Sequence, residues 1–223
     1  MDHTTPVDLE TWPRREQFAY YTGEVAVSYT ITVEVDVTEL RAALRTAGRK
    51  TYLGQVWAVA AVVNRRPEFR MTMVDGAPAV WNVVHPAFTV FNPARETFAI
   101  VWSPWDEDFA VFHDRAAEVL RTHRDAETFT PQDDLPANIV DVSSLPWTSF
   151  TGFTLHIAGG WNSLTPVFTL GKFTEREGRT LLPMAVQAHH AVADGFHTAR
   201  LIEDFRALVA EPSWVGPPGH QTV

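Results

Sequence analysis

The sequence predicts one α/β domain in which helices pack against a mixed β-sheet. Segments with strand and helix character are interspersed, with few strict strand–helix–strand alternations, and this pattern is typical of a mixed sheet. The 223 residues are enough to bury one substantial core. No repeat, linker or change of composition divides them. We therefore expect residues 1–223 to form one α/β sandwich, with an irregular or flexible tail over 212–223.

The N-terminal part is expected to contain a short helix and a long strand. The helix covers Thr11–Tyr21, with Thr11 as a candidate N-cap and Pro13 in the first turn, where its missing N–H costs little. Over Glu24–Val37, valine, isoleucine and tyrosine alternate with small or polar residues. That alternation predicts a half-buried strand.

Two helices and a hairpin follow. The first helix is expected over Thr38–Arg49. The second, over Thr51–Arg66, is apolar on nearly all sides and should therefore be buried. Within Phe69–Trp81, the pair Asp75-Gly76 lies between apolar flanks, which predicts a hairpin with its turn at this pair.

The remaining segments complete the sheet and its helices. Further strands are expected over Ala87–Phe91, Thr97–Trp102, Ile139–Ser143, Phe150–Ala158 and Val167–Phe173. An amphipathic helix is expected over Asp106–Arg121, followed by a polar loop over His123–Asn138. A turn at Glu175–Arg179 leads into an apolar strand that carries two histidines, and the last helix follows.

Composition and charge exclude several classes of function. The formal net charge of −9 argues against a nucleic-acid partner, because such binding needs clustered Lys and Arg. The absence of cysteine excludes disulfides, thiolate catalysis and Cys-based zinc sites. No apolar run approaches the ~20 residues that span a bilayer, and the polar, acidic N-terminus is unlike a secretory signal. We therefore expect a cytoplasmic protein that binds neither nucleic acid nor membrane.

Residues 187–200, QAHHAVADGFHTAR, are the strongest candidate for a functional site. They join the end of an apolar strand to the start of an amphipathic helix. Neighbouring side chains of a strand point to opposite faces, so only one of His189 and His190 can face a given cleft. Asp194 is well placed to cap the helix. An imidazole held at such a junction is suited to act as a general base.

Each of these residues also has a purely structural interpretation. A lone histidine such as His190 is often a partly buried core residue, and Asp194 can be only a helix cap. The side chains of His189, His190, Asp194 and His197 suit zinc, but adjacent strand histidines diverge, so we expect no metal. Spacing alone therefore indicates a site and no reaction.

The segment HHAVADGFH closely resembles the active-site segment of the chloramphenicol acetyltransferases, whose pattern is HHxxxDGFH. Further segments resemble that family in the same order: TWPRREQF, RRPEFRMTMVDG, VWNVVHPAFTVFN, ETFAIVWS, SSLPWTSFTGF and TPVFTLGKF. Together they span roughly Asp8 to Ala210. The HxxxDG core alone is shared by CoA-dependent acyltransferases, whereas the whole series is specific to this family.

The resemblance implies a two-layer sandwich, assembled as a homotrimer with its active sites at subunit interfaces. It implies acetyl transfer from acetyl-CoA, as co-substrate, to a hydroxyl of chloramphenicol, which gives antibiotic resistance. The reaction takes place in a ternary complex without an acyl-enzyme. His190 would be the general base, because the unperturbed pKa of imidazole lies near the operating pH. Asp194 would pair with Arg14 and brace the strand end that holds His190.

The resemblance also marks residues around the acceptor. Thr169 matches a threonine that acts through a bound water. Tyr20, Tyr21 and Tyr29 fall where the family places aromatic residues of the acceptor pocket. These four positions are therefore expected to lie near the reacting hydroxyl.

Two departures from the family pattern leave the acceptor open. Gly152 replaces a serine whose hydroxyl stabilises the oxyanion, a donor worth about 3 kcal/mol. Strand alternation would turn Thr151 to the face opposite that of Gly152, so we expect a water or a backbone N–H to replace the serine hydroxyl. Val27 replaces a pocket cysteine and changes the shape of the pocket. The alternatives are an acetyltransferase for another hydroxylated small molecule and, from a different class, a non-catalytic ligand-binding trimer.

Overall fold

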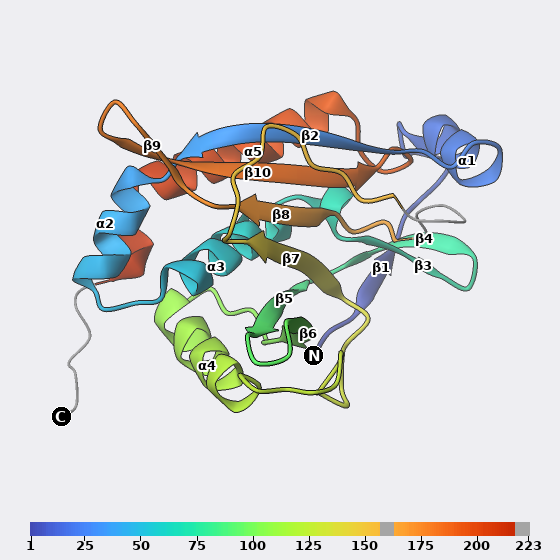
Figure 1. Cartoon of the computed structure of the whole chain (residues 1–223). Coiled ribbons are helices and arrows are strands. Elements are labelled where there is room, and N and C mark those ends of the chain that lie inside the picture. The colour runs from blue at the N-terminus through green and yellow to red at the C-terminus, as the bar shows by residue number, and fades with distance from the viewer. Residues whose placement is uncertain (157–162, 217–223) are drawn as a thin grey trace.

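The computed structural model describes residues 1–156 and 163–216 (Figure 1). Its helices are α1 (Arg15–Gly23), α2 (Thr38–Thr46), α3 (Thr51–Asn64), α4 (Phe109–Thr122) and α5 (Gly195–Ala210). Its strands are β1 (Thr4–Pro6), β2 (Ser28–Asp36), β3 (Met71–Val74), β4 (Ala77–Trp81), β5 (His85–Asn92), β6 (Thr97–Trp102), β7 (Ile139–Leu145), β8 (Val167–Gly171), β9 (Thr174–Arg176) and β10 (Arg179–His189). The 3-10 segments are η1 (Pro67–Phe69) and η2 (Ser213–Val215). Within the described ranges, no helix combines the length and apolarity needed to cross a membrane.

The main sheet is mixed, as predicted. Its strand order is β2-β10-β8-β7-β5-β6, and β9 pairs with the first part of β10. β5, β7 and β8 run parallel, whereas β10 is antiparallel to both β8 and β2. The carboxyl ends of β5, β7 and β8 therefore meet at one edge of the sheet, and β10 ends at the opposite edge. A smaller sheet has the order β1-β4-β3.

Helices cover one face of the main sheet. Figure 1 shows α5 behind β2 and β10, and α3 behind β7 and β8. α3 is buried along nearly its whole length, because its own alanine and valine side chains lie on all sides of the helix. Inward-facing sheet residues such as Phe168 and Met184 belong to the same apolar core. This arrangement confirms an α/β fold with helices packed on a mixed sheet.

Local signals predicted some boundaries closely. Asp75 and Gly76 have φ values of 49° and 80°, the positive values that a type I′ hairpin turn requires. β6 covers the predicted Thr97–Trp102. α4 begins at Phe109 rather than Asp106, because the Asp108 carboxylate caps it by accepting from the backbone N–H groups of Ala110 and Val111.

The first helix and the first long strand begin later than predicted. α1 begins at Arg15, and Thr11 does not cap it, because the Thr11 hydroxyl donates to the Asp8 carboxylate at 2.8 Å. β2 begins at Ser28, where its ladder with β10 starts opposite His189. The short strand β1, which includes a proline, was not predicted.

The strand predicted over Phe150–Ala158 is wrong for residues 150–156, and 157–158 lie outside the described residues. This segment bonds to side chains of the sheet rather than to a backbone ladder. The backbone N–H of Leu155 donates to Gln187 Oε1, and Gln187 Nε2 donates to the Leu155 carbonyl, both at 2.9 Å. A glutamine side chain thus replaces a strand partner. Phe150 and Phe153 pack against each other, with ring centroids 5.6 Å apart, although the segment forms no strand.

The tail is more ordered at its start than predicted. η2 follows Pro212, and the Trp214 ring stacks on Trp57 with centroids 4.3 Å apart. The irregular end expected from residue 212 is therefore wrong for Ser213–Val215, and residues 217–223 lie outside the described part. Burial of aromatic surface stabilises this turn against the core.

Candidate active site

His190 lies directly after the carboxyl end of β10. Its backbone N–H donates to the Val27 carbonyl at 2.8 Å, which extends the pairing with β2 by one residue. The chain then turns and enters α5 at Gly195. The imidazole therefore stands on a short connection that is held by a strand at one end and by a helix at the other.

The contacts of the His190 ring determine which nitrogen is available. Nδ1 lies 3.0 Å from the Ala193 carbonyl oxygen. A carbonyl only accepts, so Nδ1 carries a proton, and in the neutral imidazole the lone pair is then on Nε2. The Tyr21 ring stacks on the imidazole with centroids 4.4 Å apart, and the Tyr29 ring meets it edge-on at 5.2 Å. The ring is thus fixed in the tautomer of a general base at Nε2.

Arg14 joins the two parts of this connection. Its Nη1 donates to Asp194 Oδ2 at 2.7 Å, and its Nη2 donates to the backbone carbonyl of His190 at 3.1 Å. The Arg14 side chain is only 14% exposed, so these bonds are poorly screened by solvent. The pairing of Arg14 with Asp194, expected from the resemblance, is present in the structure.

Asp194 is both a helix cap and the centre of an ionic group. Its Oδ1 accepts from the backbone N–H of Phe196 at 3.0 Å and faces His197 Nδ1 at 2.8 Å. Burial alone would raise the pKa of Asp194, but the bonds from His197 and Arg14 outweigh it and hold the pKa well below its usual range. Asp194 is therefore ionised at neutral pH and accepts from both neighbours.

The four residues considered for zinc all make hydrogen bonds within the protein. Within the described ranges, no group of three or more His, Asp or Glu side chains is arranged to hold a metal ion. Nδ1 of His190 and Nδ1 of His197 are already used by Ala193 and Asp194. His189 is buried on β10 next to the turn, where its Nδ1 accepts from the Ala191 backbone N–H at 3.1 Å.

Thr169 lies on the face of the main sheet that the helices do not cover. It is buried on β8 opposite Ala185 of β10. Because side chains alternate, Thr169 shares its face with Gln187, whereas Tyr29 lies opposite Ala188 and faces the helices. One chain therefore does not bring Thr169 together with the His190 ring.

Gly152 also lies away from His190, on the segment that crosses the helix-free face (Figure 1). A Cβ atom added at Gly152 would meet nothing within 4 Å. Since residues 150–156 are not a strand, alternation does not decide where Thr151 points. Gly152 itself supplies no side-chain donor, and the space beside it is open.

The remaining expected pocket residues lie around the His190 ring. Tyr21 and Tyr29 touch the imidazole, as described above. Tyr20 is 46% exposed and packs edge-on against Tyr21, with centroids 5.2 Å apart. Val27 is half-buried, and its carbonyl accepts from the backbone N–H of His190. One chain thus brings His190, the Arg14–Asp194 pair and the tyrosine rings together.

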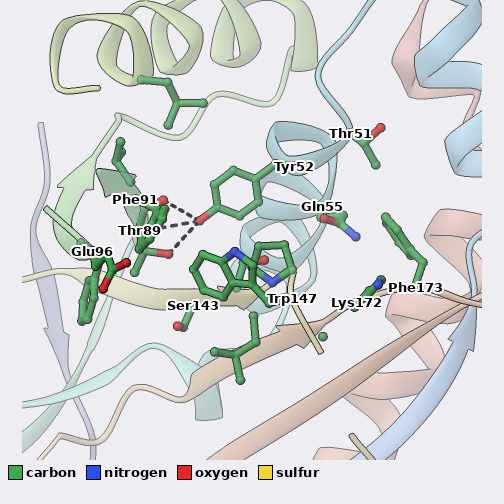
Figure 2. Close-up of a pocket in the computed structure, with 17 residues that line it drawn as sticks. Thr51, Tyr52, Gln55, Thr89, Phe91, Glu96, Ser143, Trp147, Lys172 and Phe173 are labelled. Atoms are coloured by element: carbon green, nitrogen blue, oxygen red, sulfur yellow. Dashed lines mark hydrogen bonds between the residues drawn. The ribbon is translucent and has the colours of Figure 1, made fainter. Parts of the chain in front are cut away.

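A large cavity lies at the edge where β5, β7 and β8 end, and the motifs did not predict it. Its volume is about 710 Å³. Figure 2 shows Tyr52, Trp147, Lys172 and Phe173 around it. The Tyr52 hydroxyl donates to the Thr89 carbonyl at 3.1 Å, and burial raises the pKa of Tyr52 to about 12. Five of the seventeen lining residues are aromatic, and the wall also carries one lysine and one glutamate, Glu96.

The cavity and His190 lie at opposite edges of the sheet. Leu170, next to the cavity residue Gly171, pairs with Met184, and His189 is several positions further along β10. At about 3.3 Å per residue, the separation is roughly 15–20 Å. A ligand in the cavity must be long to approach His190 of the same chain, or it must meet the histidine of another chain.

The chain is similar to proteins of one family along nearly its whole length. The family model described as chloramphenicol acetyltransferase matches residues 1–206. A chloramphenicol acetyltransferase of Streptomyces acrimycini is 60% identical over 211 residues, which cover 94% of this chain and 96% of that protein. Chloramphenicol acetyltransferase 2 of Haemophilus influenzae is 40% identical over 204 residues, which cover 92% and 96%.

The fold is also found among solved structures. A chloramphenicol acetyltransferase superposes with a TM-score of 0.80 at 24% identity, covering 93% of this chain and 100% of the other. A dihydrolipoamide acetyltransferase of Azotobacter vinelandii superposes with a TM-score of 0.67 at 20% identity, covering 90% and 88%. At these identities the likeness concerns the fold alone.

Proposed function

Because the chain belongs to the chloramphenicol acetyltransferase family, we propose that it transfers the acetyl group of acetyl-CoA to a hydroxyl of chloramphenicol, with His190 as general base. The observation that carries this proposal is the contact of His190 Nδ1 with the Ala193 carbonyl, which leaves the lone pair of the neutral imidazole on Nε2. A cytoplasmic location and a role in antibiotic resistance belong to the same proposal and rest on family membership.

The chemistry follows from the position of that lone pair. Nε2 takes the proton of the acceptor hydroxyl as its oxygen attacks the thioester carbonyl. The tetrahedral intermediate then collapses, the C–S bond breaks, and the imidazolium returns the proton to the CoA sulfur. The reaction gives an acetyl ester and free CoA thiol, with no covalent enzyme intermediate.

Arg14 and Asp194 act on this step through His190 and do not contact the substrate. Arg14 bonds to the carbonyl of His190 and to the cap of α5 at the same time. The two bonds hold the ends of the connection at a set distance from each other. They keep Nε2 in place, and correct placement of a reacting group accounts for a large part of enzymatic rate.

The oxyanion of the intermediate needs a donor that Gly152 lacks. The open space beside Gly152 is compatible with a water molecule, and backbone N–H groups of the crossing segment are the other candidates. Thr169 would act through a water near the acceptor.

The aromatic cavity supports a site for acetyl-CoA. Its volume of about 710 Å³ and its largely apolar lining suit the pantetheine arm, and Lys172 at its border suits a phosphate. The acceptor would then approach His190 from the side of Tyr20, Tyr21, Val27 and Tyr29.

We propose a homotrimer whose active sites combine residues of two subunits. His190 and the group formed by Thr169, Gly152 and the cavity lie on different parts of one chain. Large apolar side chains are also exposed near these parts, including Phe91, Phe98, Trp147 and Phe196. A ring of subunits would bring the histidine of one chain to the cavity side of the next and cover such side chains.

A second acceptor class is favoured by one observation. Because Gly152 lacks the serine hydroxyl and leaves open space, the site could hold a different hydroxylated small molecule. Turnover of such an acceptor with higher kcat/KM than chloramphenicol would favour this alternative. Binding of chloramphenicol and CoA without turnover, measured by calorimetry, would favour a non-catalytic trimer.

The test follows CoA thiol release from acetyl-CoA in the presence of chloramphenicol. The chain has no cysteine, so a thiol reagent reports only the product. We expect release by the parent protein, its loss in His190→Ala, and normal release in the matched control His123→Ala at the end of α4. Equal release by the parent and His190→Ala would overturn the role of His190, and light scattering that shows a monomer would overturn the shared site.

A further inference from the structure

We propose that Tyr29 and Thr198 form a hydrogen-bonded pair through which α5 positions the His190 ring. Tyr29 would then be a positioning residue for the base, in addition to any place in an acceptor pocket. This inference rests on the proposed function, and its test is designed to separate the two.

The pair links the sheet to the helix behind it. The Tyr29 hydroxyl lies 2.6 Å from Thr198 Oγ1, across a sequence separation of 169 residues. Tyr29 lies on β2 opposite Ala188, two residues before His190. Thr198 is fully buried in the first turn of α5, where its backbone N–H donates to the carbonyl of Asp194. The bond therefore joins the strand beside His190 to the helix that Asp194 caps.

The Tyr29 ring is one of three supports of the imidazole. Tyr21 covers the face of the ring, the Ala193 carbonyl holds Nδ1, and Tyr29 meets the ring edge-on at an angle of 67°. Tyr21 comes from α1, whereas the Tyr29 hydroxyl is bonded to a side chain of α5. The contact made by Tyr29 thus links a side chain of α5 to the imidazole, in addition to the link through Arg14 and Asp194.

Removing one hydroxyl of the pair has a different consequence from removing both. In Thr198→Val, which keeps the shape, the Tyr29 hydroxyl loses its partner next to a buried apolar group. An unsatisfied buried hydroxyl is costly, whereas replacing both partners by apolar groups of similar shape is nearly neutral. In that variant the Tyr29 ring is therefore expected to move away from the introduced methyl group and from His190. It should stay in place when its own hydroxyl is removed as well.

We expect the double variant to be more active than Thr198→Val alone. Thr198→Val should lower kcat by about tenfold with little change in KM, because the base is misplaced and binding is not altered. Tyr29→Phe should be milder, since the Thr198 hydroxyl can turn to the carbonyl of Asp194 one turn earlier. The double variant Tyr29→Phe/Thr198→Val should recover most of the lost kcat.

Each other result contradicts the proposal. Normal kcat in Thr198→Val would show that the bond does not position the base. A double variant no better than Thr198→Val would show that the hydroxyls act separately. A raised KM for chloramphenicol in Tyr29→Phe, with unchanged kcat, would show that the hydroxyl binds the acceptor instead. Thr180→Val is the matched control, because this buried threonine lies at the far end of β10 and bonds to Glu175.

A second readout does not depend on turnover. The ring protons of His190, assigned by comparison with His190→Ala, should have NMR chemical shifts that depend on the ring currents of Tyr21 and Tyr29. Thr198→Val should change these chemical shifts, and the double variant should restore them. An inactive parent protein that shows this pattern would refute the proposed function and support the positioning pair. An active parent whose His190 signals do not respond would refute the pair alone.

Discussion

Replacing Arg14 by lysine separates its charge from its geometry. The guanidinium bonds to Asp194 and to the His190 carbonyl on two different nitrogens. A lysine keeps the charge but has one compact ammonium, which cannot reproduce that fork. We expect Arg14→Lys to keep the ion pair with Asp194 and to lose the bond to His190.

The size of the effect follows from the bond that is lost. A hydrogen bond from a charged group contributes about 1.5–3 kcal/mol. If it serves to hold His190 during the reaction, its loss lowers kcat by about 10- to 100-fold. KM for both substrates should stay nearly unchanged, because the polar groups of Arg14 that have partners face the protein and not a substrate.

Steady-state thiol release at varied chloramphenicol and acetyl-CoA measures both constants. Arg176→Lys is the matched control, because Arg176 of β9 pairs with Glu34 away from His190 and both side chains are well exposed. Such a pair contributes little, so this variant should keep full activity. A kcat of Arg14→Lys within about twofold of the parent would refute the bracing role.

Three further predictions follow from other parts of the structure. Gly152→Ser adds a hydroxyl where a Cβ meets no neighbour, so it should fold normally and raise kcat by up to about 100-fold if the site lacks an equivalent donor; an unchanged kcat would mean that a water or backbone N–H already serves. Burial raises the pKa of Asp141, so its ionised form opposes folding above that pKa. Asp141→Asn should therefore raise the thermal unfolding midpoint at pH 8 more than at pH 4. A larger increase at pH 4 would contradict this prediction. The pKa of Asp194 is lower in the folded protein than its unfolded value of about 3.9, so ionised Asp194 stabilises the fold above that value. The difference in free energy of unfolding between the parent and Asp194→Asn should therefore shrink as the pH falls through the acid range. A difference that is independent of pH would contradict this prediction.

Local signals in the sequence were sufficient for much of the fold. Strict alternation, the Asp75-Gly76 pair and the capping carboxylate of Asp194 act over a few residues, and each corresponds to an observed element. The segment over 150–156 misled the same reasoning, because its composition does not reveal whether the backbone partner is a strand or the side chain of Gln187. The packing of Trp214 on Trp57 was missed for a similar reason, since it depends on a surface formed by distant residues.

The candidate site divides in the same way. Spacing pointed to residues 187–200, and the resemblance supplied the partner of Asp194, whose pairing with Arg14 the structure contains. The tautomer of His190 was beyond the sequence, because it depends on how the chain turns back to the Ala193 carbonyl. The cavity was also beyond it, because its walls come from the ends of strands that are adjacent only in the folded sheet. The roles of all the site residues remain predictions, those of His190, Asp194 and Arg14 included.

The opposite directions of β8 and β10 have a consequence for mixtures of defective chains. They place the cavity and His190 at opposite edges of one sheet. In a ring where each reaction centre takes its histidine from one chain and its cavity from the next, His190→Ala and a cavity-blocked variant are damaged in different halves. Neither is active alone, but after joint refolding about one quarter of the centres in a random mixture would combine two intact halves. A mixture of two inactive variants would thus regain activity. If each chain held a complete reaction centre, the mixture would stay inactive.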